Sequence, residues 1–141
     1  MAAHRYPLRV YFEDTDAGGV AYHANYLKWA ERARTESLRA MHLPHALMME
    51  RYDAMLVVRR IEVEYSAPAR LDDALIVETR LRAMGAATLD LTQTVLREEE
   101  GKVALLATLV VGLVCVRAGG LRPVRIPPPW RDALAGTTGT D

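Results

Sequence analysis

The segment Glu13-Asp14-Thr15-Asp16-Ala17-Gly18-Gly19 holds the residue types best suited to chemistry. It places carboxylates beside two adjacent glycines, which favour unusual backbone angles and let a ligand approach the main chain. A helical pattern follows, so the unpaired N–H groups of a helix N-terminus are expected near residues 20–23. This combination suits a carboxylate that attacks a carbonyl or activates water, while N–H donors stabilise the negative charge on the carbonyl oxygen.

Two other interpretations of the same segment stay open at this point. Asp14 and Asp16 are also the residue type that caps turns and helix starts, and spacing alone favours this reading. Asp14, Asp16 and His23 are a third possibility as metal ligands. That set is weaker, because two carboxylates and one histidine without a second histidine nearby make a poor transition-metal site.

The flanking sequence predicts the elements that position this segment. Residues 8–12 read as a short strand, and residues 21–41 repeat apolar side chains every three or four positions, as in an amphipathic helix. A short second helix is expected at 44–50. Beyond it the period falls to two, which predicts about four antiparallel strands. The fold class is therefore α+β, with a sheet that buries one face against the long helix.

The length, the net charge and the longest apolar run of the sequence exclude some classes of function. The 141 residues form one expected domain, 1–141, with residues 130–141 as a flexible tail. Eighteen basic and eighteen acidic residues give zero net charge, which argues against nucleic acid as a partner. The most apolar run, residues 103–116, is shorter than the ~20 residues of a transmembrane helix. It contains Cys115, the single cysteine, expected to be a buried thiol in a cytoplasmic protein.

The residues around the acidic segment resemble a known signature. Residues 9–26, RVYFEDTDAGGVAYHANY, are similar to the signature of hotdog-fold acyl-CoA thioesterases. The likeness continues through ERARTE at 31–36, VEYSAPARLDD at 63–73 and VCV at 114–116, and covers about residues 8–127. The subgroup that it resembles most is the Tol–Pal-associated acyl-CoA thioesterases of bacteria, with the 4-hydroxybenzoyl-CoA thioesterases more distant. A signature of this length is far more specific than one short motif.

The resemblance implies an α+β hotdog fold and hydrolysis of acyl-CoA or acyl-carrier-protein thioesters. It implies that Asp16 is the catalytic carboxylate and that the backbone amide of His23 is the oxyanion donor. The histidine ring at this position is itself implicated in catalysis in the subgroup. Family members need no metal or other cofactor, since CoA is part of the substrate. They form homodimers by joining two sheets edge to edge, and homotetramers from pairs of dimers.

The chain also departs from the family pattern. Phe12 stands where the subgroup often has tyrosine, and Gly85-Ala86-Ala87 replaces basic residues that lie near the CoA nucleotide in the 4-hydroxybenzoyl-CoA enzymes. Arg122 and Arg125 are then the candidates for binding CoA phosphates, because guanidinium groups suit phosphate oxygens. The alternative for both is an ordinary surface arginine.

Other assignments compete with this one. Glu31 and Glu36 are rival carboxylates, because some hotdog thioesterases use an acid on the long helix, although charge pairing on the helix surface is the simpler role. A non-hydrolytic acyl-binding or scaffold protein of the cell envelope is the main alternative function. A binding protein of this kind needs no catalytic carboxylate, so the presence of Asp16 argues against this alternative. A hotdog hydratase is the second alternative.

Overall fold

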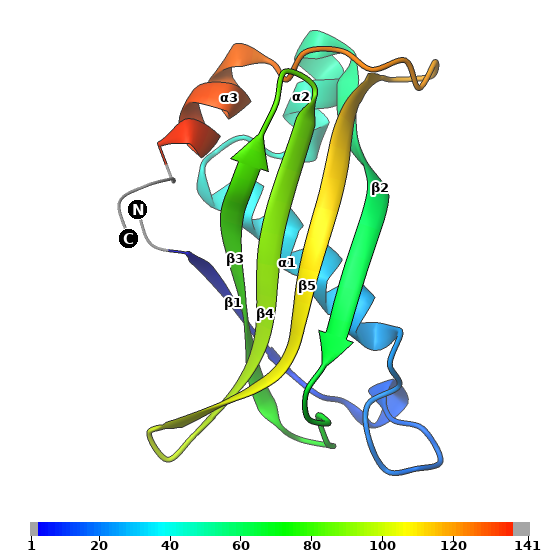
Figure 1. The fold of residues 1–141 in the computed structure, drawn as a ribbon, viewed down its shortest axis with the longest axis vertical. Coiled ribbons are helices and arrows are strands. Elements are labelled where there is room, and N and C mark those ends of the chain that lie inside the picture. Colours follow the sequence, from blue (N-terminus) through cyan, green and yellow to red (C-terminus); the bar gives the residue numbers. More distant parts are fainter. Residues whose placement is uncertain (1–2, 137–141) are drawn as a thin grey trace.

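The fold is a single antiparallel sheet that curves around one long helix. The computed structural model describes residues 3–136. Five strands pair in the order β1-β3-β4-β5-β2, with a helix between the first two strands of the chain (Figure 1). The strands are β1 (His4–Arg9), β2 (Ala54–Tyr65), β3 (Ala74–Met84), β4 (Thr88–Glu99) and β5 (Lys102–Arg117). The predicted α+β class is therefore confirmed.

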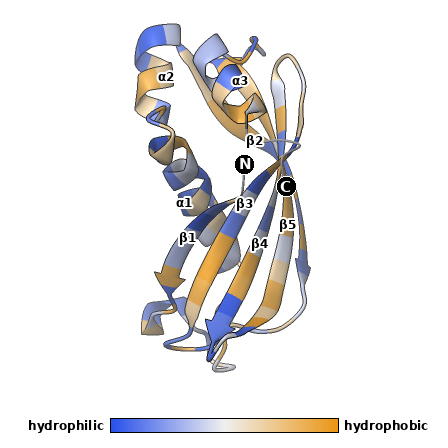
Figure 2. Cartoon of the chain, turned by 90° about the vertical axis from the view of Figure 1, so that its left-hand side faces the viewer, coloured by the Kyte–Doolittle hydropathy of each residue, from blue (hydrophilic) through white to orange (hydrophobic). Residues whose placement is uncertain are grey.

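The alternation of apolar and polar side chains explains why one face of the sheet is buried. Along β4, residues 89, 91, 93 and 95 are all buried while their neighbours are half-buried. β3 repeats this pattern with Leu75, Val77 and Thr79. Figure 2 shows the resulting hydrophobic and hydrophilic bands along the strands. Successive residues point to opposite faces of a strand, so this spacing creates the apolar floor on which a helix packs.

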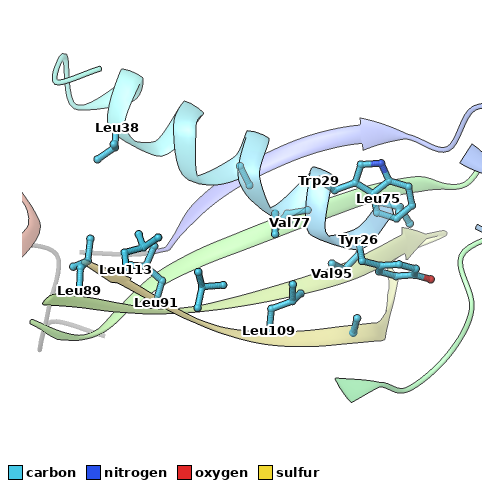
Figure 3. Packing of buried hydrophobic residues seen from close by; sticks show 14 of the residues in the cluster. Tyr26, Trp29, Leu38, Leu75, Val77, Leu89, Leu91, Val95, Leu109 and Leu113 are labelled. Atoms are coloured by element: carbon cyan, nitrogen blue, oxygen red, sulfur yellow. The ribbon is translucent and has the colours of Figure 1, made fainter. Parts of the chain in front are cut away.

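Helix α1 (Asn25–Ala40) covers that floor. Its buried residues recur every three or four positions and form one apolar stripe: Tyr26, Trp29, Ala30, Ala33, Arg34 and Leu38. Figure 3 shows Tyr26, Trp29 and Leu38 on the side of the helix that faces the strands. α1 begins four residues later than the sequence pattern suggests. Residues 21–24 instead form a bridge and a turn that connect the acidic segment to the helix.

The expected flexible tail at 130–141 is wrong for its first part. Residues Pro128–Ala135 form helix α3, in which Trp130 and Leu134 are buried. The Trp130 indole donates a hydrogen bond of 2.8 Å to the Leu43 carbonyl. Prolines at the first helical positions are compatible with a helix, because those amides have no partner inside it. Residues 137–141 lie outside the described residues.

Smaller differences concern the first two strands and the second helix. β1 spans His4–Arg9 and so begins and ends earlier than the strand expected at 8–12, and Phe12 belongs instead to a short 3-10 helix, η1 (Phe12–Asp14). The second helix, α2 (His45–Tyr52), matches its expected position. β2 starts at Ala54, earlier than its alternating part, because residues 55–58 form an unbroken apolar run.

Two further expectations can be compared with the structure. Cys115 is a buried free thiol in β5, and burial raises its pKa, so it is unsuited to act as a nucleophile.

In the part of the chain that the structure describes, no helix combines the length and apolar character needed to cross a membrane.

Candidate active site

Asp16 lies at the tip of a tight hairpin between η1 and α1. The hairpin is closed by the pairing of Thr15 with Ala21 and by a hydrogen bond of 2.9 Å from the Asp16 amide to the Val20 carbonyl. The Asp16 side chain is exposed. Its Oδ1 accepts a hydrogen bond of 2.8 Å from the Gly18 amide. This bond orients the carboxylate, and Oδ2 accepts no hydrogen bond from the described residues.

The two glycines suit this geometry. A Cβ on Gly18 would stand 3.2 Å from Asp16 Oδ1, tighter than most contacts of this kind. Gly19 has a φ of 81°, in the region that glycine adopts without steric cost. The pair therefore permits the hairpin that presents Asp16 to solvent.

Two unused backbone donors follow this carboxylate in the segment that leads into α1. The amides of Ala21 and Tyr22 donate hydrogen bonds of 2.8 Å to the carbonyls of Ala69 and Asp14. The amides of Val20 and His23 have no acceptor among residues 3–136. α1 begins two residues after His23 and has neither a side-chain cap nor an acidic residue in its first turn. The positive end of the helix dipole is thus left available to an incoming negative charge.

Aromatic side chains surround His23, and the sequence interpretation did not include them in the site. The exposed His23 ring lies 4.4 Å from the Tyr22 ring and 6.4 Å from the Tyr65 ring, between centroids. The Tyr65 hydroxyl donates a hydrogen bond of 2.8 Å to the His23 carbonyl. Tyr65 comes from the far end of β2, so a strand 42 residues away fixes the backbone of the candidate oxyanion residue. No local sequence signal marks that contact.

Asp14 and Asn25 have structural roles in this loop. Asp14 Oδ2 accepts a hydrogen bond of 2.8 Å from the Tyr11 amide, and the Asn25 side-chain amide donates to the Asp14 carbonyl at 2.8 Å. Capping therefore describes Asp14 well, as spacing suggested. Within residues 3–136, no group of three or more histidine, cysteine, aspartate or glutamate side chains is placed to hold a metal ion. The metal interpretation of Asp14, Asp16 and His23 therefore has no support in the structure.

The two arginines proposed for CoA phosphate are not brought to Asp16 within one chain. Arg122 and Arg125 are exposed in the loop after β5. Arg117, which precedes this loop, pairs with Ala54 at the start of β2, whereas the Asp16 hairpin lies near the end of β2 (Figure 1). The two arginines and Asp16 thus occupy opposite ends of the sheet.

The rival carboxylates on α1 differ from each other. Glu36 forms an ion pair of 3.2 Å with Arg39 one turn away, which is the surface pairing expected from the sequence. Glu31 is exposed and lies toward a cavity between α1 and the sheet. Neither belongs to the Asp16 hairpin or to the uncapped N-terminus of α1.

Residues 10–134 match the thioesterase-like superfamily, and the chain belongs to that family. Thioester hydrolysis, the class of activity that the sequence suggested, is thereby confirmed together with the hotdog fold.

Individual relatives agree with this family assignment. The chain is 48% identical to the acyl-CoA thioester hydrolase YbgC of Escherichia coli over 124 residues, which cover 87% of this chain and 89% of the relative. It is 40% identical to the acyl-CoA thioesterase YbgC of Haemophilus influenzae over 129 residues, 92% of each chain. The crystal structure of a probable thioesterase from Bartonella henselae superposes with a TM-score of 0.82 at 33% identity, covering 89% of this chain and all of the other.

Proposed function

We propose that the chain hydrolyses acyl-CoA thioesters, with Asp16 as the reacting carboxylate and His23 as its partner. The observation that supports this proposal most directly concerns the residues just before α1. Residues 16–23, which lead into the uncapped N-terminus of α1, hold an oriented carboxylate with one uncommitted oxygen and two unused amides. Acyl transfer needs both a base or nucleophile and donors for the developing oxyanion. The relatives named acyl-CoA thioesterases support CoA as the thiol.

In the proposed reaction the thioester carbonyl oxygen accepts hydrogen bonds from the His23 amide. In one route Asp16 takes a proton from water as the water oxygen bonds to the carbonyl carbon, and the carbon–sulfur bond then breaks. In the other route Asp16 adds to the carbonyl carbon, the carbon–sulfur bond breaks to leave an anhydride, and water hydrolyses that anhydride. In both routes the His23 ring donates a proton to the departing thiolate, a proton released from water restores the ring, and a free acid and a free thiol leave. This chemistry needs no metal and no cofactor apart from the CoA of the substrate.

The proposed active form is a homodimer that associates further into a homotetramer. β2 is an edge strand of twelve residues, and its outer side has unpaired backbone groups that suit pairing with a second copy. Tyr65, which holds the His23 backbone, lies on this strand. Pairing along β2 would therefore bring a partner close to the site and could supply Arg122 or Arg125 from the other chain to a bound CoA.

We also propose that the protein acts in the cytoplasm and has a role connected with the cell envelope. One buried thiol and no second cysteine suit a reducing compartment, which supports the cytoplasm. The resemblance to the Tol–Pal-associated subgroup supports a role connected with the cell envelope. Acyl carrier protein thioesters remain a second proposed substrate form.

The test is thiol release from acyl-CoAs of increasing chain length by purified protein. We expect Asp16→Asn to lower kcat/KM by at least about 100-fold, because proton transfer and nucleophilic steps lose their carboxylate. Glu13→Gln is the matched control, since Glu13 is an exposed carboxylate three residues away. It should stay within about twofold of wild type.

The rival functions give different results in the same assay. Release of thiol at the same rate by wild type and Asp16→Asn would remove Asp16 from the mechanism. Tight binding of acyl-CoA with no thiol release would identify a non-hydrolytic binding protein. A product hydrated at a carbon–carbon double bond would identify a hydratase.

A further inference from the structure

The peptide units on either side of the His23 Cα are both held by hydrogen bonds. The His23 amide belongs to the same planar unit as the Tyr22 carbonyl, which accepts a hydrogen bond of 2.9 Å from the Asn25 amide. The His23 carbonyl belongs to the next unit and accepts a hydrogen bond of 2.8 Å from the Tyr65 hydroxyl. Because a peptide unit is rigid, holding these two carbonyls also fixes the direction in which the His23 N–H points.

The two bonds differ in origin. The bond from Asn25 is local, since it closes the turn that leads into α1. The bond from Tyr65 reaches across the fold, because Tyr65 is the last residue of β2 and β2 ends beside this turn (Figure 1). A turn closed by local bonds can still shift as a body relative to the sheet. The Tyr65 hydroxyl limits that shift at His23 itself, whose amide has no acceptor within residues 3–136.

Tyr65 is in turn held in place by a buried neighbour. Its ring makes an edge contact with the ring of Tyr26, which is only 2% exposed, at 5.1 Å between centroids. The Tyr26 hydroxyl accepts a hydrogen bond of 2.9 Å from the Ala69 amide, and the Ala69 carbonyl accepts one of 2.8 Å from the Ala21 amide. The segment after β2 is therefore joined both to the Asp16 hairpin and to the first turn of α1.

The Tyr65 hydroxyl can act only as a donor to the His23 carbonyl. Burial raises the pKa of Tyr65, and the neighbouring Tyr26 is the second cause. The phenol is therefore protonated at neutral pH, and its single O–H hydrogen is committed to the His23 carbonyl. This bond leaves no hydrogen for a substrate, so Tyr65 acts on a reaction through His23.

We propose that Tyr65 is a positioning residue, whose hydroxyl holds the His23 peptide so that its N–H points at the oxyanion of a reacting thioester. This inference rests on the proposed hydrolysis and adds a residue to it. A donor that is already oriented stabilises the charge of the transition state more than it stabilises the bound substrate. Loss of the Tyr65 hydroxyl should therefore lower kcat and leave KM nearly unchanged.

The test is hydrolysis of an acyl-CoA by Tyr65→Phe, which keeps the ring contact with Tyr26 and removes only the hydroxyl. We expect kcat to fall at least about tenfold while KM stays within about threefold. Tyr52→Phe is the matched control, because it removes the hydroxyl of a half-buried tyrosine at the other end of β2. Both of its constants should stay within about twofold of wild type. Circular dichroism gives the folded fraction, so that rates refer to folded protein.

The leaving group separates this role from proton donation. An oxyanion forms whichever thiol departs, so Tyr65→Phe should lose the same factor on an acyl-CoA and on a thioester of an acidic aromatic thiol. A loss confined to the acyl-CoA would assign Tyr65 to proton transfer and overturn the positioning role.

NMR of protein labelled with ¹³C at the histidine carbonyls tests the contact without hydrolysis. The His23 carbonyl resonance should move upfield in Tyr65→Phe and stay in place in Tyr52→Phe, because a hydrogen bond to a carbonyl oxygen deshields its carbon. An unmoved resonance, or a kcat that falls less than tenfold while Asp16→Asn is inactive, would overturn the positioning role and leave the proposed hydrolysis standing. Equal rates for wild type, Asp16→Asn and Tyr65→Phe would overturn both.

Discussion

The two oxygens of Asp16 have different surroundings, and this difference defines the residue's proposed role. Oδ1 is held by the Gly18 amide at 2.8 Å, whereas Oδ2 accepts no hydrogen bond from residues 3–136. One oxygen therefore fixes the orientation of the carboxylate and the other is available to react. Because a side chain at position 18 would crowd Oδ1, the glycine belongs to the same arrangement. The His23 amide, which has no acceptor within residues 3–136, is the proposed complementary donor.

The proposed acid role of the His23 ring gives a prediction about the leaving group. His23→Gln keeps the backbone amide and removes the imidazole ring, so we expect kcat/KM for an acyl-CoA to fall about tenfold or more. A thioester of an acidic aromatic thiol needs no proton on departure. Its hydrolysis should therefore fall by less than about threefold in the same variant. Rates measured on both substrates with wild type and His23→Gln make the comparison.

An equal loss on the two substrates would contradict proton donation to the leaving group. Tyr22→Phe is the control, because it keeps an aromatic ring 4.4 Å from His23 and removes only an exposed hydroxyl. Its effect on both substrates should stay within about twofold.

At the scale of elements, α3 closes the end of the structure near α2. The Trp130 ring lies 5.6 Å from the Tyr52 ring in an edge contact, and its indole N–H is satisfied by Leu43. We expect Trp130→Ala to lower the free energy of unfolding by about 3–5 kcal/mol, the usual cost of removing a large buried aromatic side chain. Urea denaturation provides the measurement. Leu121→Ala, at a residue that is 63% exposed, should change it by less than about 0.5 kcal/mol.

A loss below about 1 kcal/mol in Trp130→Ala would mean that the helix contributes little and behaves as a tail. The sequence did not reveal α3, because Pro127, Pro128 and Pro129 read as a break in regular structure. The same prolines are tolerated in the first turn, and the tryptophan then reaches a carbonyl 87 residues away. That contact is tertiary and leaves no local pattern.

Elements with a regular apolar period could be predicted from the sequence, whereas elements that depend on contacts with distant residues could not. The apolar stripe of α1 and the alternation in β3 and β4 are local consequences of helix and strand periods, and both elements were found. β1 was displaced because polar His4 and Arg5 hide an alternating strand. The hairpin at 16–20 depends on cross-strand bonds, so glycines indicated a break but not its shape. Assignment of Asp16 and His23 came from the family signature, since spacing alone favoured capping.

Within residues 3–136, β2 is the longer of the two edge strands of the sheet, and the proposed dimer uses its unpaired edge. Val58 of β2 is an apolar residue that is 45% exposed, so a substitution there can change a contact along this edge without removing a core side chain. We expect wild type to sediment at twice or four times the chain mass of 15.7 kDa. Val58→Glu should shift the protein toward the monomer, because two like charges would meet across a two-fold axis. Analytical ultracentrifugation gives the masses.

Val103→Glu is the matched control, since Val103 is 61% exposed and lies on β5, where it pairs with Glu98 of β4 and is not on the β2 edge. It should keep the wild-type mass. A wild-type monomer with full hydrolytic activity would exclude the edge-to-edge dimer as a requirement of the site.

The most direct test of the central claim is a crystal structure of the Asp16→Asn variant with an acyl-CoA bound. We expect the thioester carbonyl oxygen to accept a hydrogen bond of about 2.9 Å from the His23 amide. The side-chain oxygen or nitrogen at position 16 should then face the carbonyl carbon or a water beside it. A thioester bound away from the start of α1, with position 16 facing bulk solvent, would contradict the account.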